Sequence, residues 1–328
     1  MAGSLVGRGR TSDRSAEGAL SLRSAASLRP EPAEPRTAAR RSPRSLMTRG
    51  GVESRAVGGS GMGRAGPLMF HRLAPYYDEL VGAKDYRREA RTLEALARRY
   101  VRSGGRSWID VACGTGRHLG FLRRRHVVTG VDVSPEMLRV ARRRLPGIRL
   151  LRGDMRTLRL DETFDVVSCL YSAIGHLGSE RELAATFANF ARLLKPGGIA
   201  VVEPWIDPAD FRPGFVHVLA HTGPTATVAR MAVSSRRGRR SWVHYHYLVG
   251  RPGHPVEHFE EADPGLLVPR DRLVELLGAA GLRARFLRRG LTAGRGLLVG
   301  LRPTGGPAER IDRDVPRRGG ARTALSGS

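Results

Sequence analysis

Cysteine is scarce in this sequence, which has only Cys113 and Cys169 among its 328 residues. Two cysteines cannot form the disulfide framework of a small secreted protein. Both lie in apolar, strand-like segments, so we expect buried free thiols in a reducing compartment. Long apolar runs are also missing, since none approaches the roughly 18 residues of a membrane span, and the first residues lack the apolar core of a signal peptide. The sequence therefore predicts a cytoplasmic protein without membrane association.

Lysine and aromatic residues are sparse as well. Of the 56 basic residues all but Lys84 and Lys195 are arginine, and aromatic residues make up 6% of the chain. The arginines are spread over the whole sequence beside abundant alanine, glycine and proline, which is typical of GC-rich codon usage. A nucleic-acid-binding protein more often concentrates its charge in one stripe with aromatic residues interleaved. The net charge of +25 is thus expected to attract anions in general, without a nucleic-acid partner.

Residues 1–66 lack hydrophobic periodicity and are rich in arginine, serine, alanine, glycine and proline. Such a segment buries too little apolar surface to offset the entropy of ordering it, so we expect a disordered or non-native extension. An arginine- and serine-rich transit peptide is the functional alternative, although no clear amphipathic helix is present. Residues 303–328 are also polar and are expected to form a flexible tail. A later translation start is the other alternative, at Met47, Met62 or Met69.

The intervening domain, residues 67–302, alternates between strand-like and helix-like segments. Strands are predicted at 107–112, 127–132, 148–151, 164–170, 199–203, 284–287 and 296–301. Helices are predicted at 84–101, 116–124, 135–144, 180–194 and 270–280. This alternation is typical of a mostly parallel seven-stranded sheet with helices on both faces, the Rossmann-like α/β class. Residues of about 214–262 instead show β-type runs without helices, which predicts an antiparallel β insertion.

A glycine turn follows the first predicted strand, in Trp108-Ile-Asp-Val-Ala-Cys-Gly-Thr-Gly116. Gly114 and Gly116 let the backbone bend sharply and approach a ligand closely, and the helix that follows offers unpaired N–H groups. A dinucleotide-binding turn needs a third glycine where this chain has Leu119. Asp110, at the end of the strand, suits a cofactor with a charged methionine end and no pyrophosphate. The turn therefore favours S-adenosylmethionine as the cofactor.

Acidic residues follow the next two predicted strands. Asp132 ends the second strand, where a carboxylate can accept hydrogen bonds from both ribose hydroxyls; the alternative is a charge at the start of the next helix. Gly153-Asp154-Met155 is placed to flank the adenine, or forms an ordinary turn. Together these motifs predict the S-adenosylmethionine site of a class I methyltransferase, because ligands bind at the carboxyl ends of such strands. The predicted cofactor-binding residues are Asp110, Ala112, Gly114, Gly116, Asp132, Val133, Met137, Asp154 and Met155.

Further segments show a more specific likeness. They are Tyr77-Asp78, Lys84-Asp-Tyr86, Ser172-Ala-Ile-Gly-His176, Val202-Glu-Pro-Trp205, Val243-His-Tyr-His-Tyr-Leu248 and Gly294-Arg-Gly-Leu297. Together they resemble the N,N-dimethyltransferases of dTDP-3-amino-3,6-dideoxyhexoses, which make the dimethylamino sugars of macrolide antibiotics. The resemblance runs from about Tyr77 to Leu301. It implies transfer of the methyl group of S-adenosylmethionine to the amino group of a dTDP-amino sugar, and a homodimer with a subunit interface at the β insertion.

The resemblance also implies roles for individual residues. His176 matches the family's active-site histidine and is expected to orient the acceptor amine or take its proton; a structural histidine capping a loop is the alternative. Tyr77 and Tyr86 are expected at the catalytic centre, in a segment that closes over the cofactor, or else pack against the helix that follows.

Substrate binding is expected from Glu203, Trp205 and Arg295. The guanidinium of Arg295, in its Gly-Arg-Gly turn, fits diphosphate oxygens bidentately; an ordinary surface arginine is the alternative. The β insertion is expected to form a wall of the sugar pocket, and no metal site is expected.

The chain departs from the family's pattern at several positions. Ile206 stands where a second tryptophan is usual, and Asp263-Pro264 stands where a His-Arg pair is usual. These differences leave the sugar and the number of methyl groups open. A glycine- or sarcosine-type N-methyltransferase is the nearest alternative function. An RNA methyltransferase is supported only by the net charge, and a non-enzymatic protein that binds S-adenosylmethionine is disfavoured by the intact motifs.

Overall fold

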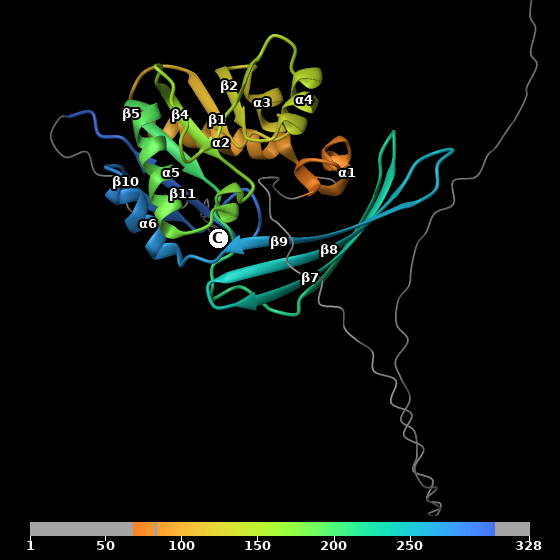
Figure 1. Ribbon diagram of the computed structural model, residues 1–328. Coiled ribbons are helices and arrows are strands. Elements are labelled where there is room, and N and C mark those ends of the chain that lie inside the picture. Colours follow the sequence, from red (N-terminus) through yellow and green to blue (C-terminus); the bar gives the residue numbers. More distant parts are fainter. Residues whose placement is uncertain (1–67, 82–83, 306–328) are drawn as a thin grey trace, which may run out of the picture. The chain divides into compact units, whose positions relative to one another are not determined.

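The structure is a computed structural model that describes residues 68–81 and 84–305 (Figure 1). All of these residues belong to one unit of the chain, Ser60–Ser328. The predictions for residues 1–66 and for most of the tail at 303–328 lie outside the described residues.

The larger of two β-sheets has seven strands in the order β10-β11-β5-β4-β1-β2-β3 (Figure 1). The parallel strands are β1 (Ser107–Val111), β2 (Val127–Asp132), β3 (Arg149–Arg152), β4 (Phe164–Cys169) and β5 (Leu194–Val202). The antiparallel strands at one edge are β10 (Arg283–Leu287) and β11 (Leu297–Leu301). The predicted mostly parallel, seven-stranded sheet is confirmed.

Helices cover both faces of this sheet (Figure 1). On one face pack α2 (Tyr86–Tyr100), α3 (Arg117–Leu122) and α4 (Pro135–Arg144), and on the other α5 (Glu180–Leu193) and α6 (Arg270–Ala279). Each layer has its own apolar core, centred on Leu93 and Leu119 in the first and on Phe187 and Leu277 in the second. Strands buried on both faces have nearly continuous apolar sequences, as in β11, where all five residues are buried. Both cysteines are free and buried, as predicted.

The start of α4 illustrates how local sequence sets an element boundary. The Ser134 Oγ accepts a hydrogen bond from the Met137 N–H at 3.1 Å, and Pro135 occupies the first helical position. Proline fits there because its missing N–H would have no partner in the helix. Ser134 therefore caps α4.

A crevice opens where the chain reverses its direction of travel across the sheet. From β1 the chain proceeds outward to β2 and β3, and it then returns to β4 on the other side of β1 before reaching β5. Loops that leave neighbouring strands in opposite directions make room for a ligand at the carboxyl ends of those strands. Three non-glycine residues there, Ala112, Tyr171 and Ser172, have φ values of 61°, 52° and 63°. Such conformations cost about 1–3 kcal/mol each and cluster at functional sites.

The second sheet is antiparallel, in the order β6-β7-β8-β9. Its strands are β6 (Val216–Thr222), β7 (Thr227–Arg237), β8 (Arg240–Gly250) and β9 (Glu257–Leu266). The predicted antiparallel insertion is confirmed, and its strands extend to residue 266, beyond the expected end near 262. We call the face that contains Arg230, Tyr245 and Asp263 the inner face of this sheet.

Three short helices that the sequence did not reveal pack on this inner face. They are η1 (Leu68–Phe70), η2 (Ala74–Tyr76) and α1 (Tyr77–Val81). Leu73 and Leu80 are fully buried against Val228 and Tyr247 of the sheet. Helices of three to five residues are too short to show a periodic apolar pattern, so periodicity could not detect them.

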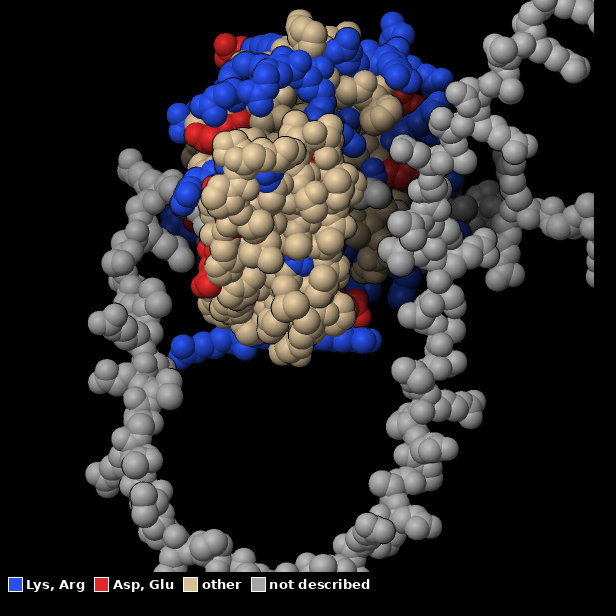
Figure 2. All heavy atoms as spheres, turned by 90° about the vertical axis from the view of Figure 1, so that its right-hand side faces the viewer, with Lys and Arg blue, Asp and Glu red and all other residues tan. Residues whose placement is uncertain are grey.

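The opposite, outer face of the second sheet is exposed and mainly apolar. Val216, Val218, Met231, Val233 and Leu248 are 40–60% exposed there. Figure 2 shows a largely uncharged surface below an upper region where lysine and arginine gather. Within the described residues, no helix is long and apolar enough to span a membrane.

Candidate active site

A cavity of about 1040 Å³ occupies the crevice at the ends of β1 and β4. The inner face of the second sheet and the short helices at residues 68–81 form its other walls. Ligand pockets usually measure about 300–1,000 Å³, so this cavity has room for two ligands end to end. Eleven of the predicted site residues line it: Tyr77, Ala112, Gly114, Asp132, Val133, Met137, Asp154, Met155, His176, Trp205 and Arg295.

Asp132 holds the glycine turn at one end of the cavity. Its Oδ2 accepts a hydrogen bond from the Gly114 N–H at 2.8 Å, and its Oδ1 accepts one from the Ser134 N–H at 2.9 Å. Burial raises the pKa of Asp132, although the hydrogen bonds from Ser134 and Gly114 oppose this rise. A carboxylate has about four acceptor positions, so Asp132 retains capacity for the two hydroxyls of a ribose.

Asp154 and Met155 lie farther along the same end of the cavity. Asp154 accepts hydrogen bonds from the Arg156 N–H at 2.8 Å and from Arg156 Nε at 3.0 Å, and these bonds lower the pKa of Asp154. Met155 packs against the core around α5. Arg156 also bonds Glu182 at 3.1 Å, which anchors this loop to α5. The loop therefore presents one fixed carboxylate and one apolar side chain to the cavity.

Two predicted cofactor residues lie behind the turn and do not line the cavity. Asp110 is 2% exposed and accepts a hydrogen bond from Ser168 Oγ at 2.6 Å, and its burial raises its pKa to about 6. Gly116 precedes α3 with φ of 75°, and a Cβ there would lie 2.6 Å from Leu145 Cδ1. Both residues shape the turn, because only backbone without a Cβ fits at Gly116 and because Asp110 is enclosed by β4.

The short helices at residues 68–81 are fastened to the cofactor turn. Asp78 Oδ1 accepts a hydrogen bond from Thr115 Oγ1 at 2.9 Å. The Ser134 hydroxyl donates to the backbone oxygen of Phe70 at 2.5 Å. Hydrogen bonds to Thr115 and to Ser134 thus hold this segment over the cavity.

The two predicted tyrosines lie in different surroundings. Tyr77 lines the cavity, and burial raises the pKa of its phenol, which stays neutral. Tyr86 is 7% exposed and does not line the cavity. Its ring packs on His118 with centroids 5.0 Å apart, and the Arg117 guanidinium lies 4.8 Å from its centroid. Tyr86 is the first residue of α2, and its side chain packs on α3, whereas the packing alternative named α2.

His176 forms an ion pair that the sequence analysis missed. Its Nδ1 lies 3.2 Å from Oδ1 of Asp263, a residue of β9 that is 7% exposed. Burial lowers the pKa of His176, but Asp263 and Glu261 outweigh this effect and raise the pKa above its ordinary value. A carboxylate at Nδ1 favours the tautomer that leaves Nε2 free to accept a proton. The Phe70 ring meets the imidazole edge to face, with centroids 5.2 Å apart.

Arg295 lies close to two aromatic rings beyond the end of β4. Its guanidinium is 5.6 Å from the Tyr171 ring centroid and 5.3 Å from that of Trp205. Arg295 Nη1 donates to Ser172 Oγ at 2.7 Å, and Ser172 Oγ donates to the Pro204 oxygen at 2.7 Å. A guanidinium has five N–H donors, so several remain for a ligand. Arg295 is consequently part of the cavity wall and not an ordinary surface arginine.

Glu203 supports this wall from behind. It is fully buried and does not line the cavity. Its Oε2 accepts from the Tyr171 N–H at 2.8 Å, and its Oε1 accepts from the Thr292 N–H at 3.0 Å. Glu203 therefore holds both the left-handed backbone at Tyr171 and the loop that carries Arg295.

The inner face of the second sheet adds a second cation that the sequence analysis missed. The Arg230 guanidinium lies 5.3 Å from the ring centroid of Tyr245, and both residues line the cavity. Arg230 Nε is buried and has no hydrogen-bond partner among the described residues. A buried donor without a partner is costly, which suits a residue that meets a ligand oxygen. In a chain with arginine throughout, no sequence signal distinguishes Arg230.

Comparisons with known proteins agree with this arrangement. A profile described as a methyltransferase domain matches residues 109–198. The chain is 42% identical over 219 residues to the dTDP-3-amino-3,6-dideoxy-α-D-glucopyranose N,N-dimethyltransferase of Streptomyces fradiae, across 66% of this chain and 85% of that protein. It is 39% identical to the dTDP-3-amino-3,4,6-trideoxy-α-D-glucopyranose N,N-dimethyltransferase of Streptomyces venezuelae, across 66% of this chain and 92% of that protein.

Solved structures show the same likeness. DesVI of Streptomyces venezuelae matches with a TM-score of 0.66 and 37% identity, over 71% of this chain and 98% of that one. CalS10, an amino pentose methyltransferase of Micromonospora echinaspora solved with S-adenosylmethionine bound, matches with a TM-score of 0.63 and 35% identity, over 70% of this chain and 96% of that one. The likeness therefore covers nearly the whole of both solved structures and about 70% of this chain.

Proposed function

This chain belongs to the S-adenosylmethionine-dependent N,N-dimethyltransferases of dTDP-amino-deoxyhexoses, and we propose that it methylates the amino group of a dTDP-amino-dideoxyhexose in antibiotic sugar biosynthesis. One observation supports this most strongly: a single cavity joins the glycine turn and Asp132 to His176 and Arg295. Methyl transfer is an in-line displacement that needs the acceptor nitrogen about 3 Å from the methyl group. A continuous cavity lets the two reactants meet without water between them.

S-adenosylmethionine supplies the methyl group as a sulfonium, and the residues at one end of the cavity fit this cofactor. Space lies open in front of Gly114, where an added Cβ would meet nothing within 4 Å. Asp132 accepts the ribose hydroxyls with its remaining lone pairs. Asp154 and Met155 flank the adenine, and backbone at Ala112 approaches the methionine end.

The ion pair of His176 and Asp263 handles the proton of the acceptor amine. Only a neutral amine has a lone pair for the methyl carbon, so an ammonium must first lose a proton. His176 Nε2 accepts this proton or orients the neutral amine, while Asp263 stabilises the imidazolium that forms. As the nitrogen–carbon bond forms, the carbon–sulfur bond breaks, and the methylated ammonium then loses a proton. A second methyl transfer repeats these steps.

Arginine side chains bind the rest of the acceptor. Arg295, which lies near the rings of Tyr171 and Trp205, has N–H donors available for diphosphate or sugar oxygens. Arg230, with its unpartnered Nε, provides a second positive group on the opposite wall. Both fit an anionic nucleotide sugar better than a free amino acid of the glycine type.

The proposed function is tested by incubating the protein with S-adenosylmethionine and a panel of dTDP-3-amino and dTDP-4-amino sugars. Mass spectrometry of the products is expected to show one or two added methyl groups on at least one of them. Methylation of glycine or sarcosine in preference to every nucleotide sugar would contradict the proposal. Cofactor binding without turnover of any acceptor would favour the non-enzymatic alternative.

We further propose that residues 67–302 form the catalytic domain, that the protein works in the cytoplasm, and that two copies pair through the outer face of the second sheet. The free, buried Cys113 and Cys169 suit a reducing compartment. The exposed Val218 and Met231 support the homodimer, because apolar patches of this kind mark protein interfaces. Sedimentation is expected to show a dimer for the natural chain and a monomer for Met231→Lys.

A further inference from the structure

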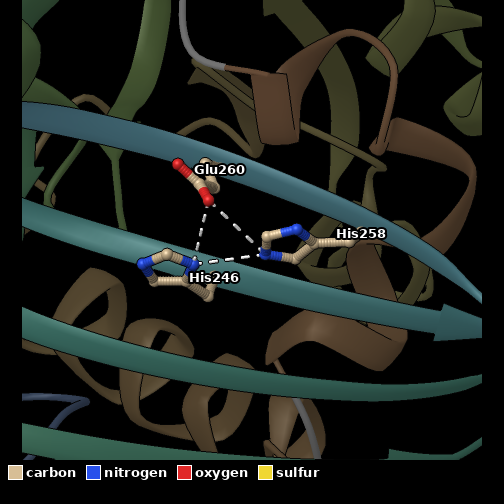
Figure 3. Close-up of side chains that lie close together, drawn as sticks. All are labelled: His246, His258 and Glu260. Atoms are coloured by element: carbon tan, nitrogen blue, oxygen red, sulfur yellow. Dashed lines mark hydrogen bonds and ion pairs between the residues drawn. The ribbon is translucent and has the colours of Figure 1, made fainter. Parts of the chain in front are cut away.

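Three side chains with metal-ligating atoms converge on the outer face of the second sheet. They are His246 of β8 and His258 and Glu260 of β9 (Figure 3). His246 Nδ1 lies 3.2 Å from His258 Nε2 and 3.5 Å from Glu260 Oε1. His258 Nε2 lies 3.8 Å from the same oxygen. All three residues are exposed.

These separations, 3.2–3.8 Å, lie within about 0.3 Å of the spacing of ligands around one metal ion. Zinc binds imidazole nitrogen and carboxylate oxygen at about 2.0–2.2 Å in tetrahedral sites, which places neighbouring ligand atoms about 3.3–3.5 Å apart. A point about 2.0–2.2 Å from all three atoms therefore exists, at the bond lengths typical of zinc. Two imidazoles and one carboxylate also form a donor set that divalent transition metals prefer over magnesium or calcium.

The sheet fixes the three residues in place. His246 and Glu260 are directly opposed in the β8–β9 register, and His258 is two residues from Glu260. Residues two apart on a strand face the same way, so backbone hydrogen bonds hold the three on one face. A metal ion thus needs little rearrangement of the backbone to bind.

We propose that His246, His258 and Glu260 bind a divalent transition-metal ion of the zinc type, on the same face of the sheet that we propose as the subunit interface. This proposal departs from the expectation of no metal site, and its ligands come from two neighbouring strands. The ion would link β8 to β9. On the inner face these strands carry Tyr245 and Asp263, so the metal would stiffen the wall of the cavity from its far side without contacting the reactants.

Calorimetric titration of the untagged, chelator-treated full chain with Zn²⁺ tests the proposal. We expect saturable binding of one ion per chain in the micromolar range and a rise in Tm of a few degrees at saturation. The three ligands come from one chain, so this stoichiometry does not depend on the proposed dimer. Mg²⁺ at the same concentration is expected not to bind.

The variants His246→Gln, His258→Gln and Glu260→Gln are each expected to weaken Zn²⁺ binding at least tenfold. His254→Gln is the matched control, because His254 is an exposed histidine between β8 and β9 outside the cluster. Co²⁺ is expected to give visible absorption bands with the natural chain and the control, and to lose them in the three variants. Because the readouts are metal binding and Tm, they are independent of methyl transfer. No saturable Zn²⁺ binding, or equal binding by the cluster variants and the natural chain, would overturn the proposal.

Discussion

The two ends of the cavity are built in different ways. At the cofactor end, Ala112 and Gly114 follow β1 and Asp132 ends β2. These strands are neighbours in both the sheet and the sequence, and backbone N–H groups make the contacts that shape the site. At the acceptor end, pairs of side chains from distant segments make the contacts, as between His176 and Asp263.

This difference suggests how each end tolerates change. A site made by backbone geometry depends on glycines and on one carboxylate, so its sequence has little freedom. A site made by side-chain pairs can exchange its members while the sheets stay in place. His176 and Asp263 form such a pair, since they come from segments far apart in the chain. The expected effects of substitutions therefore differ between the two ends.

The largest effect is expected at the acceptor end, from His176→Asn. Loss of the base or orienting group should lower kcat by roughly 10²-fold or more. Calorimetry is expected to show unchanged affinity for S-adenosylmethionine, since the cofactor end does not depend on this side chain. A parallel loss of cofactor affinity would mean that the two ends are not independent.

At the cofactor end, Asp132→Ala is expected to raise the dissociation constant for S-adenosylmethionine about tenfold or more, since hydrogen bonds to charged groups contribute about 1.5–3 kcal/mol. Asp132 also holds the backbone N–H groups of Gly114 and Ser134, so Tm should fall as well. Asp132→Asn keeps one acceptor oxygen, so its dissociation constant for S-adenosylmethionine is expected to lie between those of the natural chain and the alanine variant. Unchanged cofactor affinity in the alanine variant would remove Asp132 from the site.

Arg295→Ala tests whether Arg295 binds the acceptor or takes part in methyl transfer. If Arg295 holds the acceptor equally in the ground and transition states, KM for the dTDP-amino sugar rises about tenfold while kcat changes little. The effect should be small for a free amino sugar without diphosphate. An equal rise in KM for both acceptors would contradict diphosphate binding by Arg295. It would not contradict the assignment of the protein as a methyltransferase.

A smaller change, less than about tenfold in kcat at neutral pH, is expected from Asp263→Asn. Asp263 raises the pKa of His176 against the effect of burial, so the acid limb of the kcat–pH profile should move to lower pH in the variant. The raised pKa also means that the ion pair stabilises the fold most below the ordinary histidine pKa of about 6.5, and that this stability is lost as pH rises through the folded-state pKa. The Tm difference from the natural chain should therefore be larger at pH about 5 than at pH about 9. An unshifted profile would argue against the pair.

No effect is expected at either end from a chain that begins at Met62. Residues 1–66 have the composition of a segment that cannot form a core. Tm, cofactor affinity and kcat are expected to equal those of the full chain. A clear loss in any of them would show that the segment docks on the domain or on a partner.

The cofactor end and the fold could largely be predicted from the sequence, because their signals are local. The alternation of strands and helices, the Ser134 cap and the glycine turn each depend on neighbouring residues. Asp110 and Gly116 were recognised as parts of the turn, but the sequence could not show that they lie behind it, since this depends on packing against Ser168 and Leu145.

The acceptor end was predicted less completely because its contacts are long-range. His176 could be named from the resemblance to the family, but its partner Asp263 lies in another sheet, far away in the sequence. Glu203 looked like a substrate ligand, whereas the fold places it beneath Tyr171, where it holds the backbone. The short helices at residues 68–81 left no periodic pattern, so their packing over the cavity was not foreseen in detail.

The alternation of side chains along β8 also sets which mutations this protein can accept during evolution. Tyr245 and His246 are neighbours in sequence but face opposite sides of the second sheet. Inserting or deleting one residue within β8 would exchange the two sets of side chains, placing histidines in the cavity and tyrosines outside. A two-residue change would preserve both faces and shift only which residues meet across the strands. Length variation in this strand among related proteins should therefore occur in steps of two, with single-residue changes confined to the turns.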